Sequence, residues 1–343
     1  MLSFNELFTN SNQLNEKLIM INNGANYGQV VILAGGAGSG KGFAISQYLE
    51  GNKFKIRDVD EWKKLSQRLS ILSRRYKPET IIDKYGNKLS EKDKELVQKL
   101  VISKNLTLDK LDLRNPQHVY ILHILVDAIG LKDRTLDLLL SDALEKSEKG
   151  ILDNIMFDIT AKNITSIEKI VPTLLKVGYK PKNIHIVWVL TDYTVAVKQN
   201  STRDRVVPDD ILLQTHEGAA LTMNKITRNG YVPNGIDGGI YVVLGGAGNT
   251  IVYTEKDREA STKDELKSID GSGGDKIVVK SLEKDKQSGR QKKIVVIKDF
   301  NYLQLKKPGK AFDKNNKVVQ AKLYQWVLDN IPKTDLTRHL WPK

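Results

Sequence analysis

The amino-acid sequence predicts an α/β fold: a parallel β-sheet with helices on both faces, a helical insertion, and a small basic α+β region. Three observations support this prediction. Short apolar runs rich in β-branched residues alternate with segments of helical periodicity, which is the pattern of a parallel sheet. Residues 61–149 are charged, Leu-rich and helical in pattern over a stretch too long for one crossover helix. Residues 251–343 contain 21 Lys and Arg against 13 Asp and Glu, so they carry +8 of the net charge of +13.

The first predicted strand is the apolar run at residues 29–34, which ends at a cluster of glycines. Apolar side chains then recur at helical spacing from Phe43 to Leu49, so we expect a helix there. A strand, a glycine-rich turn and a helix in succession form one unit of an α/β sheet. Because the run is apolar throughout, we expect the strand to be buried on both faces.

Further strands and helices are expected along the rest of the chain. The expected strands cover residues 53–57, 150–158, 183–190 and 293–298, with a hairpin or strand pair at 240–254. The expected helices cover residues 166–177 and 321–331, with two more on either side of a basic loop between residues 194 and 227. These elements divide the chain into a core at residues 1–250, with its insertion at about 61–149, and a basic region at 251–343.

The composition excludes several classes of protein. The chain has no cysteine, which excludes a disulfide framework, a thiolate zinc site and a cysteine nucleophile. Its five histidines are not at metal-ligand spacing. The first residues do not resemble a signal peptide and no apolar run approaches 18 residues, so we expect a soluble, cytoplasmic protein with no membrane partner. The net charge favours an anionic partner such as a nucleotide, a nucleic acid or an acidic metabolite.

The most specific motif lies between the first strand and the first helix and has the pattern GxxxxGK. Consecutive backbone N–H groups in such a loop bind anions, and the helix N-terminus adds its dipole. The lysine supplies a positive charge to the β and γ phosphates of a nucleotide. We therefore predict an ATP or GTP site; the alternative is a glycine-rich turn with an incidental lysine. The predicted residues are Gly35, Gly36, Ala37, Gly38, Ser39, Gly40, Lys41, Gly42 and Phe43.

Gly42 departs from the phosphate-loop pattern, because this position normally holds Ser or Thr. That hydroxyl coordinates the Mg²⁺ that bridges the β and γ phosphates. Without it, Mg²⁺ must be held through water or by carboxylates from elsewhere in the chain. Asp58, after the second predicted strand, and Asp158, which ends the third, are the candidate carboxylates, although both also suit capping or loop structure.

Two further groups suit phosphoryl transfer to a hydroxyl, which needs a carboxylate near the acceptor and cations near the phosphates. Asp60 shares one face of an extended segment with Asp58, although it also suits the N-cap of the next helix. Arg203 and Arg205 lie in a loop between two expected helices, as in a kinase lid. A solvated basic loop is the alternative for the arginines.

Taken in order, these pieces resemble the zeta-toxin family of P-loop kinases over residues 28–230. The matching segments are GGAGSGKG, RDVDEW, FDIT, LLKVGYKP and TRDRVVP, followed by the QTH that contains His216. The resemblance implies a P-loop kinase that transfers the γ-phosphoryl group of ATP, with Mg²⁺, to a substrate hydroxyl. It implies that Asp60 is the base, that Lys41, Arg203 and Arg205 stabilise phosphate charge, and that Asp158 organises Mg²⁺.

The sequence also departs from that family, so its sugar-nucleotide substrate is not carried over. Ile159 replaces the small Gly after Asp158, and the insertion at 61–149 is long.

Two alternatives remain open for the function. One is a nucleic-acid-directed kinase that acts on a polynucleotide 5′ hydroxyl or a hydroxymethylated base. It is motivated by the basic region at 251–343 and its aromatic residues Phe300, Tyr302 and Phe312, although a solvated Lys-rich surface also explains that composition. The other is a nucleotide-binding interaction module with degraded catalysis, which the glycine at position 42 motivates.

Overall fold

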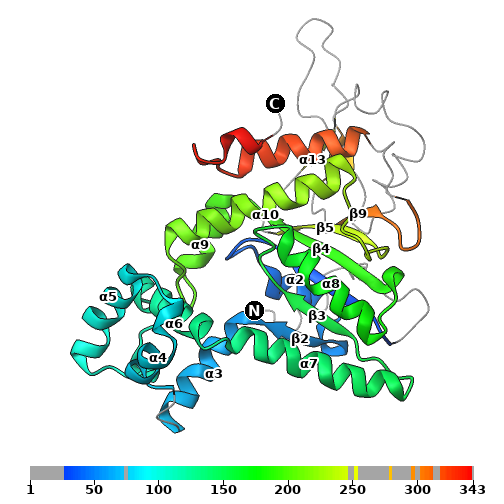
Figure 1. Ribbon diagram of the computed structural model, residues 1–343. Helices are drawn as coiled ribbons and strands as arrows, with labels where there is room; N and C mark the ends of the chain where they lie inside the picture. Colours follow the sequence, from blue (N-terminus) through cyan, green and yellow to red (C-terminus); the bar gives the residue numbers. More distant parts are fainter. Residues whose placement is uncertain are drawn as a thin grey trace, which may run out of the picture.

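A six-stranded sheet forms the centre of the computed structural model, and its strand order is β2-β3-β1-β4-β5-β9 (Figure 1). The first five strands are parallel, and β9 pairs antiparallel with β5. This arrangement confirms the predicted α/β sheet. The strands are β1 (Val30–Ala34), β2 (Lys55–Asp58), β3 (Ile155–Asp158), β4 (Ile184–Thr191), β5 (Ile240–Gly245) and β9 (Tyr302–Lys306). The structure describes residues 27–72, 76–245, 251–253, 278–279, 295–297, 302–311 and 317–341.

Strand β1 lies in the middle of the sheet, between β3 and β4. Leu33 is in register with Asp158 of β3, and Ala34 is in register with Trp188 of β4. The carboxyl ends of these strands therefore meet at one edge. The chain runs from β1 to β2 on one side of β1, and from β3 it crosses to β4 on the other side. Open α/β sheets bind ligands at the point where the strand order reverses in this way.

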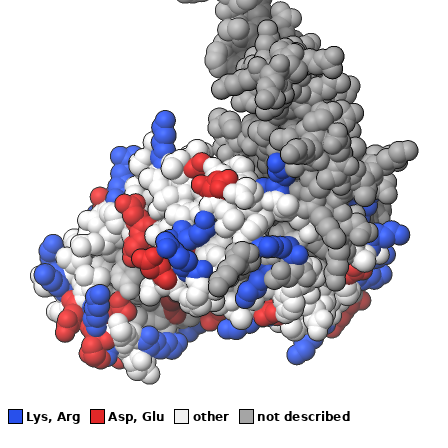
Figure 2. Space-filling model, turned by 90° about the horizontal axis from the view of Figure 1, so that it is seen from above, with Lys and Arg blue, Asp and Glu red and all other residues white. Residues whose placement is uncertain are grey.

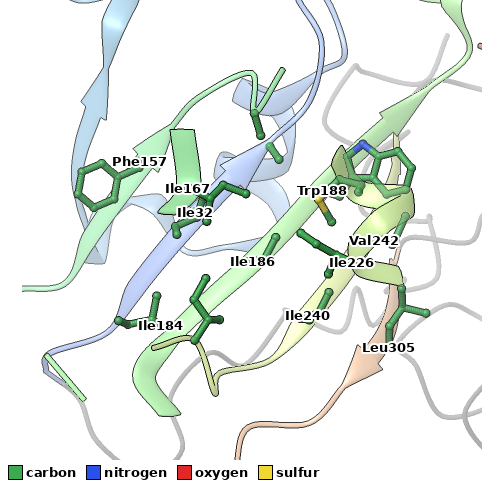
Figure 3. Packing of buried hydrophobic residues seen from close by; sticks show 14 of the residues in the cluster. Ile32, Phe157, Ile167, Ile184, Ile186, Trp188, Ile226, Ile240, Val242 and Leu305 are labelled. Carbon is green, nitrogen blue, oxygen red and sulfur yellow. The ribbon is translucent and has the colours of Figure 1, made fainter. Parts of the chain in front are cut away.

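Helices cover both faces of the sheet, as predicted. Along β1, Val30, Ile32 and Ala34 belong to one buried cluster and Val31 and Leu33 to another, because successive residues of a strand face opposite sides. The first cluster, part of which Figure 3 shows, is covered by α7 (Leu131–Glu148), α8 (Thr165–Val177), α10 (Asp209–Asn229) and α13 (Lys317–Asn330). The second is covered by α2 (Lys41–Tyr48). Burial on both faces explains the unbroken apolar sequence of β1.

The predicted helical insertion is present between β2 and β3, and it lies to one side of the sheet in Figure 1. It has a hydrophobic cluster of its own, which contains Ile81, Val97, Ile121 and Leu125. Its last helix, α7, also packs on the main sheet, so the insertion is anchored to the core. Its other helices are α3 (Val59–Leu72), α4 (Pro78–Tyr85), α5 (Glu91–Leu100) and α6 (Pro116–Ala128).

The predicted hairpin at residues 240–254 is wrong. Strand β5 pairs with β4 and β9 instead, and its residues are buried on both faces of the main sheet, a place that a local hairpin would not provide. Strand β6 (Ile251–Tyr253) belongs to a separate sheet with β7 (Val278–Val279) and β8 (Val295–Ile297). Strand β3 is also shorter than predicted, since it begins at Ile155.

Part of the basic region packs on the core, because β9 extends the main sheet and α13 packs on α10. Much of the rest, including Phe300 and Phe312, lies outside the described residues, as does the side chain of Tyr302. The division of the chain at residue 250 therefore stays a prediction. In the part of the chain that the structure describes, no helix combines the length and the apolar character needed to span a bilayer.

His185 makes the stability of this fold sensitive to acid. Its side chain is fully buried on β4, where Nδ1 accepts the Gly239 N–H at 2.8 Å and Nε2 therefore donates to Gln29 Oε1 at 3.0 Å. Burial, together with the positive charge of Lys306, lowers the pKa of His185 to about 4. The unfolded chain thus binds a proton that the folded chain excludes, so we expect about 3 kcal/mol of stability to be lost as the pH falls from about 6.5 to 4.

Urea unfolding at pH 7 and pH 4 measures this loss. A His185→Gln variant should lose less stability on acidification than the unchanged protein, whereas a variant of the exposed His339, His339→Gln, should behave like the unchanged protein. Equal acid sensitivity in all three proteins would show that His185 is not responsible.

Candidate functional site

The glycine loop leaves β1 at Gly35 and ends at Gly40, the N-cap of α2. Gly38 has a φ of 71° and Gly40 a φ of 86°, a left-handed conformation that glycine adopts without strain. A Cβ at Gly38 would lie 2.7 Å from the carbonyl oxygen of Ala196, so the loop packs closely on α9 (Tyr193–Ser201). Within the described residues, the N–H groups of Gly38 and Gly40 have no acceptor. They lie beside the first N–H groups of α2, at a helix N-terminus, which is a position where unpaired N–H groups attract anions.

Lys41 folds back over this loop. Its Nζ donates to the carbonyl oxygens of Gly35 and Gly36, at 2.9 Å and 3.2 Å, and lies 3.7 Å from Oδ1 of Asp158. The structure therefore brings together two residues that the sequence predicts for the site. A cation over the loop and a carboxylate beside it are the charges that a nucleoside triphosphate and its metal ion require.

Ser39 carries a buried hydroxyl with no partner among the described residues. The residue is 1% exposed, and its Oγ makes no hydrogen bond there. Its backbone is held, because its carbonyl oxygen accepts the Thr191 hydroxyl at 2.6 Å. A buried polar atom without a partner costs free energy, so native proteins usually satisfy it with protein, water or ligand. The position of this hydroxyl inside the glycine loop suits a phosphate oxygen.

Helix α10 holds the loop in place from outside. The Ala37 N–H donates to Thr215 Oγ1 at 3.1 Å, and His216 Nε2 donates to the Ala37 carbonyl oxygen at 2.6 Å. The imidazole also lies directly against Gly36, where the ring would overlap any Cβ. Burial is the main cause of a lowered pKa at His216, and the charge of Lys41 lowers it further. A neutral His216 with its proton on Nε2 is therefore the form that binds the loop.

The predicted carboxylates lie along the same edge of the sheet. Asp58 ends β2 in register with Asp158, which ends β3. Asp60 is the second residue of α3, but its side chain is outside the part that the structure describes, so its role as a base stays a prediction. Because β3 separates β2 from β1, Asp58 lies about 10 Å across the sheet from the strand that leads into the glycine loop.

The two predicted arginines lie on the loop that joins α9 to α10. Arg203 is exposed and Arg205 is half-buried. The buried side chain of Asn200 fixes this loop, since it both donates to the Val207 carbonyl oxygen at 2.8 Å and accepts the Val207 N–H at 3.0 Å.

The helical insertion contacts the same loop through the Val206 N–H, which donates to the Leu113 carbonyl oxygen at 3.0 Å. This loop at residues 202–208, called the arginine loop below, therefore joins the insertion to α10, the helix that holds the glycine loop.

The first turn of α2 has free space at position 42, where phosphate loops usually carry a hydroxyl. Gly42 is exposed, and a Cβ there would meet no atom within 4 Å. The following Phe43 is 59% exposed and makes an edge contact with Tyr48 at 5.9 Å between ring centroids. A serine at position 42 would therefore fit without any rearrangement.

Sequence reasoning did not identify Thr191 and Thr215, which hold the glycine loop, or Asn200, which holds the loop between α9 and α10. Thr215 contacts a residue 178 positions away, and no periodicity predicts such a contact. The only signal was the position of Thr215 and His216 in the segment that resembles the zeta-toxin family. The sequence GGAG occurs a second time at residues 245–248, and its first residue, Gly245, packs on Ser39 and Thr191. Its remaining residues lie outside the described part.

Comparisons with protein families, curated sequences and solved structures gave a match only among the solved structures. No protein-family model and no curated protein sequence matches the chain. A structure from the PezAT chromosomal toxin-antitoxin system of Streptococcus pneumoniae is similar over 70% of this chain and 73% of the other, with 12% sequence identity and a TM-score of 0.36. The description of the site therefore rests on the strand order and geometry of this chain itself.

Thr215 offers a direct test of the contact between α10 and the loop. Replacing it by valine keeps the shape of the side chain but leaves the Ala37 N–H without its acceptor, so Thr215→Val should lower the free energy of unfolding by about 1 kcal/mol. Thr215→Ser keeps the hydroxyl and should lose clearly less. Urea denaturation compares the two variants, and equal losses would contradict the role of the hydrogen bond.

Proposed function

We propose that this protein is an ATP-dependent phosphotransferase of the P-loop kinase type, which transfers the γ-phosphoryl group of ATP to a substrate hydroxyl. One observation carries the proposal: a glycine loop at a helix N-terminus contains a buried hydroxyl, that of Ser39, without a described partner, and Lys41 lies over that loop. The carboxyl edge of a parallel sheet is also where such folds bind nucleotides.

In the proposed complex, the phosphate groups of ATP would bind to the glycine loop and to Lys41. The N–H groups of Gly38 and Gly40 and the start of α2 would donate to phosphate oxygens. Lys41 would exchange the carbonyl oxygens of Gly35 and Gly36 for the β and γ phosphates, while Ser39 would gain an acceptor. These contacts stabilise negative charge that grows on the phosphates during transfer.

The acceptor hydroxyl is proposed to bind over β3, between the nucleotide and Asp60. Its oxygen forms a bond to the γ-phosphorus while the bond from the γ-phosphorus to the β–γ bridging oxygen breaks, so ADP leaves. Asp60 accepts the proton of the hydroxyl, a role that the resemblance to the zeta-toxin family supports. Arg203 and Arg205 are proposed to stabilise the transferred group from the arginine loop, which the insertion contacts through the hydrogen bond from the Val206 N–H to Leu113.

Mg²⁺ is the expected metal, and its ligands must differ from the usual set. Asp158 beside Lys41 and Asp58 in register with it suit a hard cation that takes oxygen ligands. Within the described residues, no group of three or more potential ligand side chains gathers at one point, so phosphate and water would complete the coordination. When bound, the ion neutralises charge on the β and γ phosphates.

The described surface does not single out a polymeric acceptor. On the face shown in Figure 2, Lys and Arg side chains lie among Asp and Glu side chains. Much of the basic region that motivates a nucleic-acid partner lies outside the described residues. The proposal therefore specifies the reaction and the hydroxyl group and leaves the acceptor to experiment.

The proposed binding of Mg²⁺ can be tested by substitutions at position 42, where the backbone has room for a side chain. Gly42→Ser supplies the hydroxyl that P-loops use for Mg²⁺, so the Mg²⁺ concentration for half-maximal ATP turnover should fall about tenfold, which corresponds to ~1.4 kcal/mol. Gly42→Ala is the matched control and should leave that concentration unchanged. A fall in both variants, or in neither, would contradict the assignment.

The base can be tested with γ-labelled ATP, Mg²⁺ and pools of sugar nucleotides, nucleosides and hydroxyl-ended DNA. Asp60→Asn should lower transfer to the acceptor by about a hundredfold or more with little change in ATP affinity, because it removes the proton acceptor. Asp137→Asn, at an exposed position of α7, should leave transfer unchanged. If the protein binds ATP but labels no acceptor in any pool, a nucleotide-binding interaction module would be the better description.

A further inference from the structure

A turn at residues 334–341 binds a buried carboxylate of α10. Glu217 is 2% exposed, and its two oxygens receive hydrogen bonds from four donors. The Thr334 N–H donates at 2.8 Å, the Thr334 hydroxyl at 3.0 Å and the Trp341 indole N–H at 3.3 Å, and the Thr337 hydroxyl also donates. Because a carboxylate has about four acceptor positions, the turn satisfies it almost completely.

Loss of the contact between Glu217 and the turn would be costly in free energy. A carboxylate that loses its hydrogen bonds inside a protein leaves an uncompensated charge, which is far more costly than the loss of an exposed contact. Trp341 also belongs to the main hydrophobic cluster, together with residues of α10 and α13. The position of α10 at Glu217 therefore depends on the turn.

Glu217 directly follows the two residues that hold the phosphate loop. Successive side chains of a helix point about 100° apart, so neighbours on α10 reach different parts of the molecule. Thr215 and His216 reach Ala37, and Glu217 reaches the turn. Gly218 packs against Lys162, in the segment that follows β3. Helix α10 is thus fixed on one side by the turn and on another by the loop.

We propose that the turn at 334–341 is a positioning element of the nucleotide site, which acts on the phosphate loop through Glu217, Thr215 and His216. Glu217 touches no substrate in this scheme and is a positioning residue. Its effect on nucleotide affinity rests on the proposed function, whereas its effect on the order of the loop does not. Weakening the turn should therefore loosen residues 35–41 even when no nucleotide is added.

The test combines one double variant with two controls. Thr334→Val with Thr337→Val removes two of the four donors to Glu217 while keeping the size of both side chains. Thr334→Ser with Thr337→Ser retains both hydroxyls. Arg228→Gln removes a different contact between α10 and α13, in which the guanidinium lies 4.0 Å from the ring centroid of Tyr324, so it controls for a general loss of helix packing.

Two measurements are made on all the folded proteins, well below their unfolding temperatures. Amide hydrogen exchange of residues 35–41 should be about tenfold faster in the valine double variant, because the loop is less firmly held. The Kd for ATP should rise about fivefold or more, the size of a typical coupling between sites. The serine double variant and Arg228→Gln should stay close to the unchanged protein in both measurements.

Unchanged exchange in the valine variant, or an equal rise in Arg228→Gln, would overturn the proposal, since either result means that the turn only adds general stability. If the unchanged protein binds no ATP, the proposed function is wrong. Hydrogen exchange still decides in that case whether the turn orders the loop.

Discussion

The hydrogen bonds between α10 and Ala37 are the constraint on which the candidate site depends. A glycine loop is conformationally permissive, so the sequence of the loop alone does not fix its shape. Thr215 accepts the Ala37 N–H, His216 donates to the Ala37 carbonyl oxygen, and the imidazole occupies the space beside Gly36. These contacts hold the middle of the loop in place, while the N–H groups of Gly38 and Gly40 have no acceptor among the described residues.

The same helix links three parts of the molecule that are distant in sequence. Its N-terminus follows the arginine loop, whose Val206 N–H binds Leu113 of the insertion. Its middle holds the glycine loop and, at Glu217, the turn that ends at Trp341. Helix α10 therefore connects both the insertion and the turn near residue 340 to the glycine loop at the carboxyl edge of the sheet.

Much of the fold could be predicted because its signals are local. The apolar run before Gly35, the glycine pattern and the helix after it are contained in about twenty residues, and each has its own physical cause. The hairpin at 240–254 was predicted wrongly because two short apolar runs on either side of glycines resemble a hairpin. Strand β5 pairs in parallel with β4 instead, and β4 lies more than fifty residues earlier in the sequence, where no local pattern predicts the pairing.

The candidate site could be predicted only where its residues follow strands. Lys41 is predicted by the glycine pattern that follows the first strand and Asp158 by its place at the carboxyl end of the third, and the structure places their side chains 3.7 Å apart. The sequence does not mark Thr215 or Glu217 as part of the site, because threonine and glutamate are common in helices that have no role in a binding site. Their roles depend on which helix packs beside the loop, and that is decided by the tertiary structure.

The most direct measurement of the central claim is a crystal structure of the protein with a non-hydrolysable ATP analogue and Mg²⁺. The account predicts phosphate oxygens at about 3 Å from the N–H groups of Gly38 and Gly40 and from the hydroxyl of Ser39. It also predicts that both bonds from α10 to Ala37 are retained. An analogue bound elsewhere, or a loop that leaves α10 when the phosphates bind, would contradict the account.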